Sequence, residues 1–466
     1  MTTLKTRHLL IRRSLSPDEP FHTTRFSYEV KPMHTHNTSR RSLLVGSTQT
    51  LAGAALVGGL TLSRSAHAAG SDEIKVALIG CGGRGTGAAV QCLNVPDRIK
   101  LVAVADAFLD RAEAAAQQLK KHHPDRVDLP RERIFSGLEA YQQALGCGAD
   151  LVLLCEPPGF RPAHYRAAVE AGKHVFMEKP VCIDAPGFRS VMETNQLADQ
   201  KKLKVVVGLN IRHDPRYGET VQRIHDGAIG PIRLLRAYGN NAGVWVRQRQ
   251  PGQTELAYQM RNWYYFVWLS GDLNVEQHVH MLDLANWAKG DQHPVEANGM
   301  GGRQVRKGKD FGHIYDRHFV EYTYADSTKL YSQCRHMANV WSSGSVDLHG
   351  LQGTANCGGR IEGPQAWTYS GPKVEGHQQE HVDLVKAIRA DAPHNEGYYG
   401  ATSSMTAVLG RMATYSGQVV RWDDAVAKGP DELPAQLAWD ASPRILPDAD
   451  GSYEHAVAVP GVYKPY

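Results

Sequence analysis

The sequence lacks the features of disulfide-stapled, zinc-binding and nucleic-acid-binding proteins. Its seven cysteines are an odd number among 466 residues, and no two of them form a C-x-x-C pair. Neither a disulfide framework nor a zinc cluster is therefore expected. Lysine and arginine exceed aspartate and glutamate only slightly, 52 against 48, and part of the excess lies near the amino terminus. This small charge excess gives no argument for a nucleic-acid partner.

The sequence also contains no repeats and no low-complexity blocks. Its composition limits the class of protein to which it can belong. Hydrophobic residues make up 42% of the chain and charged residues 21%, both ordinary for a soluble globular protein. Disordered, collagen-like and multi-span membrane proteins are excluded. The length predicts about three domain-sized units.

The first 68 residues have the pattern of an export signal. Paired arginines, Arg40 and Arg41, precede a stretch without charge from Leu43 to Ser63, and Ala66-His67-Ala68 fits a small-x-small cleavage site. Glycine, serine and threonine dilute the apolar stretch, which makes it weak for a membrane-spanning helix. We expect a twin-arginine signal peptide, with Met33 as a possible start, and a periplasmic or otherwise exported protein without stable membrane insertion after cleavage.

A glycine-rich turn follows the first strand pattern of the mature chain. Ile74 to Ile79 are aliphatic, as a buried parallel strand requires, and they run into Gly80-Cys81-Gly82-Gly83-Arg84-Gly85. In this G-x-G-x-x-G pattern Gly80 permits a tight turn, Gly82 lets the backbone approach a pyrophosphate, and Gly85 lets helix and strand pack closely. The start of the next helix offers free N–H groups to phosphates.

Asp106 ends the second predicted strand, 21 residues after Gly85. A carboxylate there accepts hydrogen bonds from both hydroxyls of an adenine ribose and repels a 2′-phosphate, so NAD is favoured over NADP. The alternative is a helix cap for the alanine-rich segment that begins at Phe108.

Strand and helix patterns continue to alternate as far as Val207, which predicts an α/β fold with a doubly wound parallel sheet. Ligands of such sheets lie beyond the carboxyl ends of the strands, and the candidate residues gather at those ends. The predicted cofactor-binding residues are Gly80, Gly82, Arg84, Gly85, Asp106, Glu156, Pro157, Glu178 and Lys179.

These motifs resemble the Gfo/Idh/MocA family, named for glucose–fructose oxidoreductase, inositol dehydrogenase and rhizopine catabolism. The matching residues are Gly80–Gly85, Asp106, the A-G-K-H-V-F-M-E-K-P stretch from Ala171 to Pro180, and Gly208–His213. The resemblance spans about residues 73–425. It implies a Rossmann domain followed by an α+β domain with a large, mostly antiparallel sheet, a sugar or polyol substrate, and a homo-oligomer, either dimer or tetramer. It also implies that Lys179 lies near the nicotinamide and the substrate hydroxyl.

The second domain supplies candidate proton-transfer residues in a helix predicted between Ser270 and Trp287. Glu276, His280 and Asp283 share one face of such a helix, whereas His278 points elsewhere and has no predicted role. The family usually shows D-x-x-x-H-x-x-D here, so Glu276 replaces the first aspartate. No metal is predicted, because the spacing of Glu276, His278 and His280 suits ligands on a strand better than on a helix.

Four residues are weaker candidates for contacting the substrate: Arg212, His213, Asp283 and the aromatic Trp263. The predicted domains are residues 1–68 for the leader, 73–210 for NAD binding, 211–428 for substrate and oligomer contacts, and 429–466 for a tail that wraps the surface.

We expect a hydride to move between a sugar or polyol hydroxyl carbon and NAD, with Lys179, His280 and Glu276 as catalytic residues. Because free NAD is scarce outside the cytoplasm, an exported enzyme would need to hold its NAD tightly. Two alternatives stay open. One is an NAD-dependent glycosidase or lyase that oxidises the sugar transiently and eliminates the glycosidic oxygen. The other is a non-catalytic sugar-binding or sensing protein.

Overall fold

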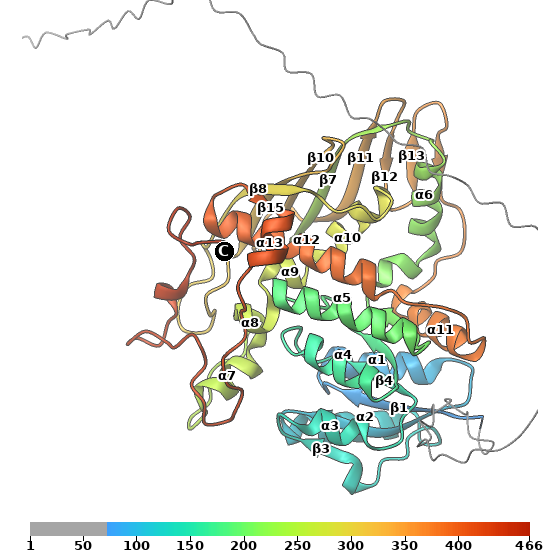
Figure 1. Cartoon of the computed structure of the whole chain (residues 1–466), viewed down its shortest axis with the longest axis vertical. Coiled ribbons are helices and arrows are strands. Elements are labelled where there is room, and N and C mark those ends of the chain that lie inside the picture. Colours follow the sequence, from blue (N-terminus) through green and yellow to red (C-terminus); the bar gives the residue numbers. More distant parts are fainter. Residues whose placement is uncertain (1–71) are drawn as a thin grey trace, which may run out of the picture. The chain divides into compact units, whose positions relative to one another are not determined.

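The structure, a computed structural model, describes residues 72–466 (Figure 1). The leader prediction, with Arg40 and Arg41, lies outside the described residues. Within them, no helix is long and apolar enough to cross a membrane.

The amino-terminal part of the described chain is a doubly wound parallel sheet, as predicted. Within residues 72–466 its six strands stand in the order β3-β2-β1-β4-β5-β6, and every pairing is parallel. The strands are β1 (Ile74–Ile79), β2 (Ile99–Asp106), β3 (Ile134–Ser136), β4 (Leu151–Leu154), β5 (His174–Met177) and β6 (Val205–Val207). The strand order reverses between β1 and β4, and the glycine loop after β1 therefore lies at the switch point where such sheets bind ligands.

Helices cover both faces of this sheet. They are α1 (Gly83–Asn94), α2 (Leu109–His122), η1 (Arg131–Arg133), α3 (Ala140–Leu145), α4 (Arg161–Glu170) and α5 (Ala185–Gln200). Helix α5 begins where the Asp184 carboxylate accepts a hydrogen bond from the Gly187 N–H at 2.8 Å, an ordinary N-cap. The short strand β3 and helix α3 were not predicted, because three half-buried residues and a six-residue helix leave little periodicity.

The carboxyl-terminal part builds a second, mostly antiparallel sheet, again as predicted. Its strand order within the described residues is β14-β13-β12-β11-β7-β10-β9-β8-β15, and β10 pairs in parallel with β7. The strands are β7 (Ile232–Asn241), β8 (Glu296–Gly302), β9 (Arg317–Thr323), β10 (Lys329–His336), β11 (Ser343–Gly350), β12 (Thr354–Asn356), β13 (Arg360–Glu362), β14 (Trp367–Thr368) and β15 (Val420–Arg421). Alternating buried residues on β9 and β10 turn one face of the sheet toward the helices.

The remaining helices lie between and beside the two sheets. They are η2 (Asn210–His213), α6 (Pro215–His225), α7 (Glu255–Arg261), η3 (Trp263–Tyr265), α8 (Val267–Ser270), α9 (Leu273–Glu276), α10 (Val279–Ala288), α11 (Gly376–Arg389), α12 (Gly397–Ser416), α13 (Trp422–Lys428) and η4 (Glu454–Ala456). Helix α12 is buried along most of its length and contacts both β8 and α5 (Figure 1). Helix α11 follows β14 of the second sheet in sequence but packs on α1, β5 and β6 of the first part.

The helix predicted between Ser270 and Trp287 is interrupted. Helix α9 ends at Glu276 and α10 begins at Val279. At the break the His278 N–H donates to the Leu273 carbonyl oxygen, five residues back, so the turn is wider than an α-helical turn. The prediction that Glu276, His280 and Asp283 stack on one helical face is therefore wrong.

The tail after residue 428 packs on both parts of the chain. The Trp439 ring lies 5.6 Å from the ring of Phe108 in the first part, and Tyr463 lies 5.5 Å from Tyr415 of α12, both measured between ring centroids. The tail thus contacts residues in both parts of the chain.

Candidate functional site

The first cavity of the site is a groove of about 570 Å³ at the carboxyl ends of the parallel strands. Its lining includes the loop from Gly80 to Gly85, Asp106 and Pro157. Helix α1 begins beside the groove at Gly83, and its N-cap residue Gly82 supplies no side-chain hydrogen bond. The first N–H groups of this helix therefore remain available to an anion.

The glycines of the loop fit a dinucleotide for separate reasons. A Cβ on Gly80, where φ is +90°, would lie 2.3 Å from the Glu156 nitrogen, and a Cβ on Gly85 would lie 1.8 Å from the Gly80 oxygen. These two positions must be glycine for the turn to pack against β4. A Cβ on Gly82 or Gly83 would meet nothing within 4 Å. Their openness leaves room for a phosphate to approach the backbone, as the motif predicts.

Asp106 lies at the end of β2 and lines the same groove. Its two carboxylate oxygens accept hydrogen bonds from the N–H groups of Cys81 at 2.7 Å and Phe108 at 2.9 Å. Burial raises the pKa of Asp106 above its ordinary value, and the two backbone N–H groups oppose that rise. The carboxylate thus fixes the glycine loop and the start of α2. It also keeps lone pairs for ribose hydroxyls.

A second, smaller cavity of about 260 Å³ shares part of its wall with the groove. The shared lining residues are Arg84, Cys155, Glu156 and Trp263. Lys179 of the first part and Glu276 and His280 of the second part all line this smaller cavity. The structure therefore brings the three predicted catalytic residues together from both parts of the chain, next to the dinucleotide groove.

Lys179 is held by Glu276 at two points. Its Nζ donates to the Glu276 Oε1 at 3.0 Å and to the Glu276 carbonyl oxygen at 2.7 Å. Both side chains are mostly buried, with 14% and 13% of their surface exposed. The peptide bond between Lys179 and Pro180 is cis. The glutamate that replaces the family's usual aspartate has the length needed to reach the lysine.

His280 lies in the same cavity as a neutral imidazole. Burial lowers its pKa well below the ordinary value, and the positive charge of Lys179 acts in the same direction. Its buried Nδ1 has no hydrogen-bond partner among the described residues. His377 of α11 also lines the cavity, and the Glu375 carboxylate lies 2.8 Å from its Nδ1. The sequence patterns did not single out His377, because it stands at the start of a helix far from every motif.

A charged cluster supports the wall between the two cavities. The Arg84 Nε donates to the Glu178 Oε1 at 2.5 Å, and the Arg84 Nη2 lies 3.8 Å from the Glu380 carboxylate. Burial raises the pKa of Glu380 well above its ordinary value, and the nearby Glu178 charge adds to the rise. Glu156 is also buried; the His164 Nδ1 lies 3.4 Å from its Oε1, and neither carboxylate oxygen has a hydrogen-bond partner among the described residues.

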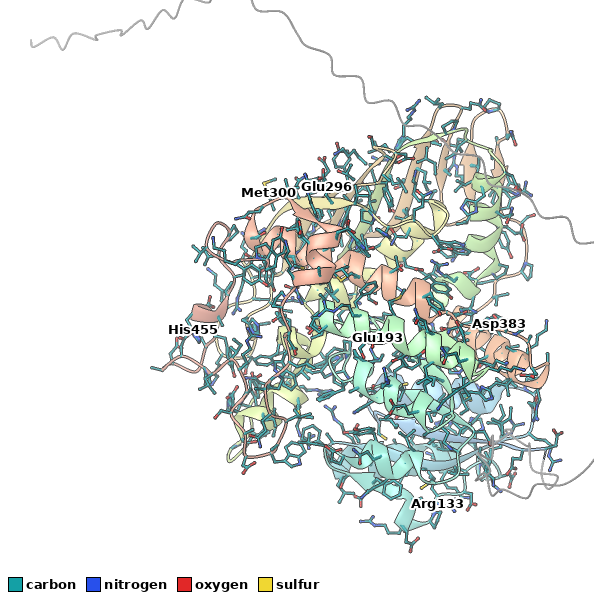
Figure 2. The ribbon with its side chains drawn as sticks, viewed as in Figure 1. Arg133, Glu193, Glu296, Met300, Asp383 and His455 are labelled. Carbon is teal, nitrogen blue, oxygen red and sulfur yellow. The ribbon has the colours of Figure 1, made fainter. Side chains whose placement is uncertain are left out.

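Three predicted substrate contacts lie elsewhere in the described chain. Arg212 forms a two-pronged pair with Asp283, with both N–O distances 2.8 Å, and neither residue lines either cavity. The His213 Nδ1 lies 2.7 Å from a carboxylate oxygen of Asp383 (labelled on α11 in Figure 2), and its Nε2 lies 3.4 Å from Glu396. Such pairs secure packing between helices. The fourth predicted residue, Trp263, lines both cavities.

His278 has a structural setting. Its Nε2 lies 2.6 Å from the Ser332 Oγ of β10, and its ring fills the space that a Cβ on Gly239 of β7 would need. Burial lowers its pKa to about 3. Within residues 72–466, no cluster of three or more histidine, cysteine, aspartate or glutamate side chains is arranged to hold a metal ion.

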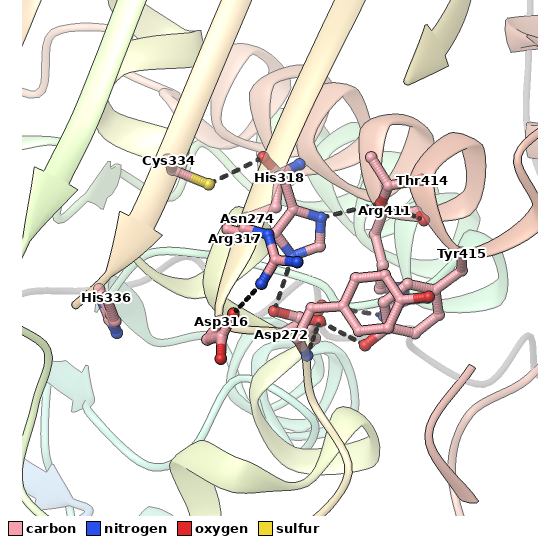
Figure 3. Close-up of polar contacts among 12 residues, drawn as sticks. Asp272, Asn274, Asp316, Arg317, His318, Cys334, His336, Arg411, Thr414 and Tyr415 are labelled. Atoms are coloured by element: carbon pink, nitrogen blue, oxygen red, sulfur yellow. Dashed lines mark hydrogen bonds and ion pairs between the residues drawn. The ribbon is translucent and has the colours of Figure 1, made fainter. Parts of the chain in front are cut away.

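Behind the cavity a buried network anchors α9 (Figure 3). Asp272 precedes this helix and is fully buried with φ of +84°. One carboxylate oxygen lies 3.2 Å from the His318 Nε2, and the other accepts from the Tyr315 N–H at 3.0 Å and from the Tyr415 hydroxyl. Although burial alone would raise the pKa of Asp272, these partners lower it. The network fixes the turn from which Glu276 reaches the lysine.

Comparison with known proteins agrees with the architecture. Residues 74–209 match the family described as "Oxidoreductase family, NAD-binding Rossmann fold". The chain is 25% identical over 254 residues to inositol 2-dehydrogenase of Rhizobium meliloti. This alignment covers 54% of this chain and 66% of that protein. It is 27% identical over 220 residues to inositol 2-dehydrogenase 4 of Saccharopolyspora erythraea, covering 47% and 55%. The chain thus spans less than two thirds of each of these curated relatives.

The solved structures extend the likeness across both sheets. An aldose-aldose oxidoreductase from Caulobacter crescentus, complexed with glycerol, superposes with a TM-score of 0.58 over 75% of this chain and 99% of that one. At 17% sequence identity, this match shows the common fold.

Proposed function

We propose that the chain is an oxidoreductase of the Gfo/Idh/MocA type, since the NAD-binding family model matches residues 74–209, and that it moves a hydride between NAD and a hydroxyl-bearing carbon of a sugar or polyol. One observation carries the proposal. Lys179, Glu276 and His280, which come from two parts of the chain, line one small cavity that shares a wall with the dinucleotide groove.

The residues of the groove fit NAD. The open backbone at Gly82 and the start of α1 suit its phosphates, and the Asp106 carboxylate suits the hydroxyls of its adenine ribose. When bound, NAD supplies the nicotinamide carbon that accepts or donates the hydride. The buried Glu156, without a hydrogen-bond partner among the described residues, faces both cavities and is suited to accept from an amide of the cofactor or a substrate hydroxyl.

Lys179 and His280 have different roles at the substrate hydroxyl. The ammonium of Lys179, oriented by Glu276, donates a hydrogen bond to the substrate oxygen. The neutral imidazole of His280 is able to take the hydroxyl proton as the carbon is oxidised. Such positioned acid–base help accelerates a reaction by about 10²–10⁴-fold. Trp263 offers an aromatic face to the C–H surface of a sugar ring.

The cavity also bears on the class of substrate. At about 260 Å³ it lies below the usual range for drug-sized ligands, and it therefore favours a single sugar or cyclitol ring. The names of the relatives, inositol 2-dehydrogenases, support a polyol of this size.

The test is a substrate panel with the purified protein and NAD. Cyclic polyols, aldoses and linear polyols are each supplied, and NADH formation is followed by absorbance. Lys179→Ala should abolish NADH formation with the active substrate while NAD affinity stays within about threefold of the wild-type value. Full activity of Lys179→Ala would refute the assignment of the lysine, and a wild-type protein that binds no NAD would refute the proposed function.

Export through the twin-arginine pathway and assembly into a homo-oligomer stay predictions. The paired Arg40 and Arg41 and the alanine-rich site before Ala69 support export. Amino-terminal sequencing of the protein from the periplasm should begin near Ala69. An intact leader on a cytoplasmic protein would refute export, and light scattering of the mature protein tests the assembly.

A further inference from the structure

The dinucleotide groove is lined partly by residues from the carboxyl-terminal part of the chain. Trp245, Arg247, Met260 and Trp263 belong to the segment between β7 and α8, yet all four line the groove together with the glycine loop and Asp106. We call residues 245–263 the roof segment. Its presence means that the groove is walled by both parts of the chain rather than by the parallel sheet alone.

The roof segment is fastened to the first part beside the groove. The Arg261 guanidinium donates to both carboxylate oxygens of Asp110 on α2, at 2.7 and 3.0 Å. The same guanidinium lies 4.0 Å from the ring centroid of Phe108, which lines the groove. The Phe108 ring also contacts Trp439 of the tail, with centroids 5.6 Å apart. These contacts form a latch between the roof segment and the first turn of α2.

The roof segment is also ordered internally. The Arg247 N–H donates to the side-chain oxygen of the buried Asn262 at 2.8 Å, and the rings of Trp245 and Trp263 meet edge to face with centroids 5.8 Å apart. Because Asn262 adjoins Arg261, the latch and the groove-lining residues are joined within one short segment.

Two guanidiniums in this arrangement have no acidic partner. Arg111 and Arg247 both line the groove, and neither forms an ion pair among residues 72–466. Burial lowers the pKa of Arg111 below its ordinary value. Asp106 opposes that shift, while the positive charges of Arg261 and Arg247 add to it. Cations that repel one another across a groove are stabilised by an anionic ligand between them.

We propose that the roof segment closes over the bound dinucleotide, with Arg247 and Arg111 binding its phosphate-bearing adenosine half, and that the latch between Arg261 and Asp110 slows release of the cofactor. This inference rests on the proposed function, because it takes NAD as the ligand of the groove. It assigns cofactor binding to two residues outside the glycine motif, and one of them, Arg247, also lies outside the Rossmann domain.

The experiment measures cofactor release from the full chain. Protein loaded with NADH is mixed with excess NAD+, and the decay of NADH fluorescence gives the dissociation rate. Arg247→Ala should raise that rate about tenfold or more, which corresponds to the loss of one charge-assisted hydrogen bond. Arg261→Met, which breaks the latch without altering the groove lining, should raise it by about threefold. The matched control is Arg360→Ala, an exposed arginine on β13, and it should release NADH at the wild-type rate.

The outcomes separate this inference from the proposed function. Wild-type release rates in both Arg247→Ala and Arg261→Met would refute the role of the roof segment in holding the cofactor, and would leave the proposed function intact. A wild-type protein that binds no NADH would overturn both. Should Arg247→Ala fail to fold, as judged by its circular dichroism and melting curve, Arg261→Met alone decides the role of the latch.

Discussion

Shortening Glu276 to aspartate is a sharp test of the catalytic geometry. In the structure the Glu276 Oε1 lies 3.0 Å from the Lys179 Nζ. Removing one methylene withdraws the carboxylate by about 1.5 Å, the length of a carbon–carbon bond. If the backbone stays in place, the two charged groups separate to roughly 4.5 Å, beyond hydrogen-bond distance. Lys179 then keeps its bond to the Glu276 carbonyl oxygen but loses the contact that orients its ammonium toward the cavity.

The size of the effect follows from the separation and the burial. At an effective dielectric constant of about 20, the attraction of two unit charges falls from roughly 5.5 to roughly 3.7 kcal/mol when they move from 3.0 to 4.5 Å apart. Because a little over a tenth of each side chain is exposed, water screens part of this difference. We therefore expect a net loss of about 1.4 kcal/mol in transition-state stabilisation, which is a tenfold drop in kcat. Glu276→Gln keeps the length but removes the charge, and it should lower kcat at least as much.

The assay is steady-state kinetics with the polyol identified by the panel, together with an NADH titration. For Glu276→Asp we expect kcat to fall about tenfold, with KM and the NADH dissociation constant changed by less than about threefold. Glu362→Asp, a change of the same kind at an exposed ion pair on β13, is the control. If Glu276→Asp turned over at the wild-type rate, the idea that the carboxylate positions Lys179 would be wrong.

Substitutions at two glycines of the loop should distinguish cofactor binding from folding. Gly82→Ala should keep the melting temperature but weaken NAD binding. Gly85→Ala should lower the melting temperature, because its Cβ would lie 1.8 Å from a backbone oxygen. Equal effects of both changes on calorimetric melting would contradict this. Asp272→Asn should lower the free energy of unfolding in urea by about 3–5 kcal/mol, because it removes a fully buried carboxylate that is held by His318 and Tyr415. A loss under about 1 kcal/mol would show that these contacts contribute little. Burial alone would lower the pKa of His213, but the nearby carboxylates, chiefly Asp383 and Glu396, together outweigh burial and raise this pKa to about 10. The contribution of protonated His213 to the free energy of unfolding is thus complete below about pH 6.5, the pKa of histidine in the unfolded chain, and it is lost as the pH rises through 10. The urea midpoints at pH 7 and pH 10 should therefore differ less in His213→Asn than in the wild type.

The parallel sheet could be predicted from sequence because each of its signals is local. A buried strand such as Ile74–Ile79 carries its own aliphatic pattern, and the glycine loop carries its own conformational requirement, visible in the 2.3 Å contact that a Cβ on Gly80 would make. The second sheet was predicted in outline only. Short strands such as Thr354–Asn356 owe their pairing to their neighbours, and three residues give no readable period.

The convergence of Lys179 and His280 could be predicted because the family resemblance assigned both to one site. The pairing of Arg212 with Asp283 away from both cavities could not be predicted from the sequence. Each is a charged residue near a motif, and sequence alone cannot show that the two neutralise each other at 2.8 Å. The helical-face argument also failed at a specific place, where the backbone widens at His278. Roles of charged residues depend on which opposite charge lies nearby, and that is set by long-range packing.

The distance between the lysine and its glutamate depends on a residue that no motif pointed to. Arg411 of α12 is fully buried, and its guanidinium donates to the carbonyl oxygens of Ile183 at 3.0 Å and Gly271 at 3.1 Å. Ile183 follows Lys179 in the first part of the chain, and Gly271 lies in the turn that leads to Glu276 in the second. One planar guanidinium therefore ties together the two backbone segments that carry the catalytic pair. A misplacement of about 1 Å at a reacting group is costly in rate. Together with the packing of α12 on α5, this buried tie helps the site, which is divided between the two parts of the chain, to keep a separation of 3.0 Å.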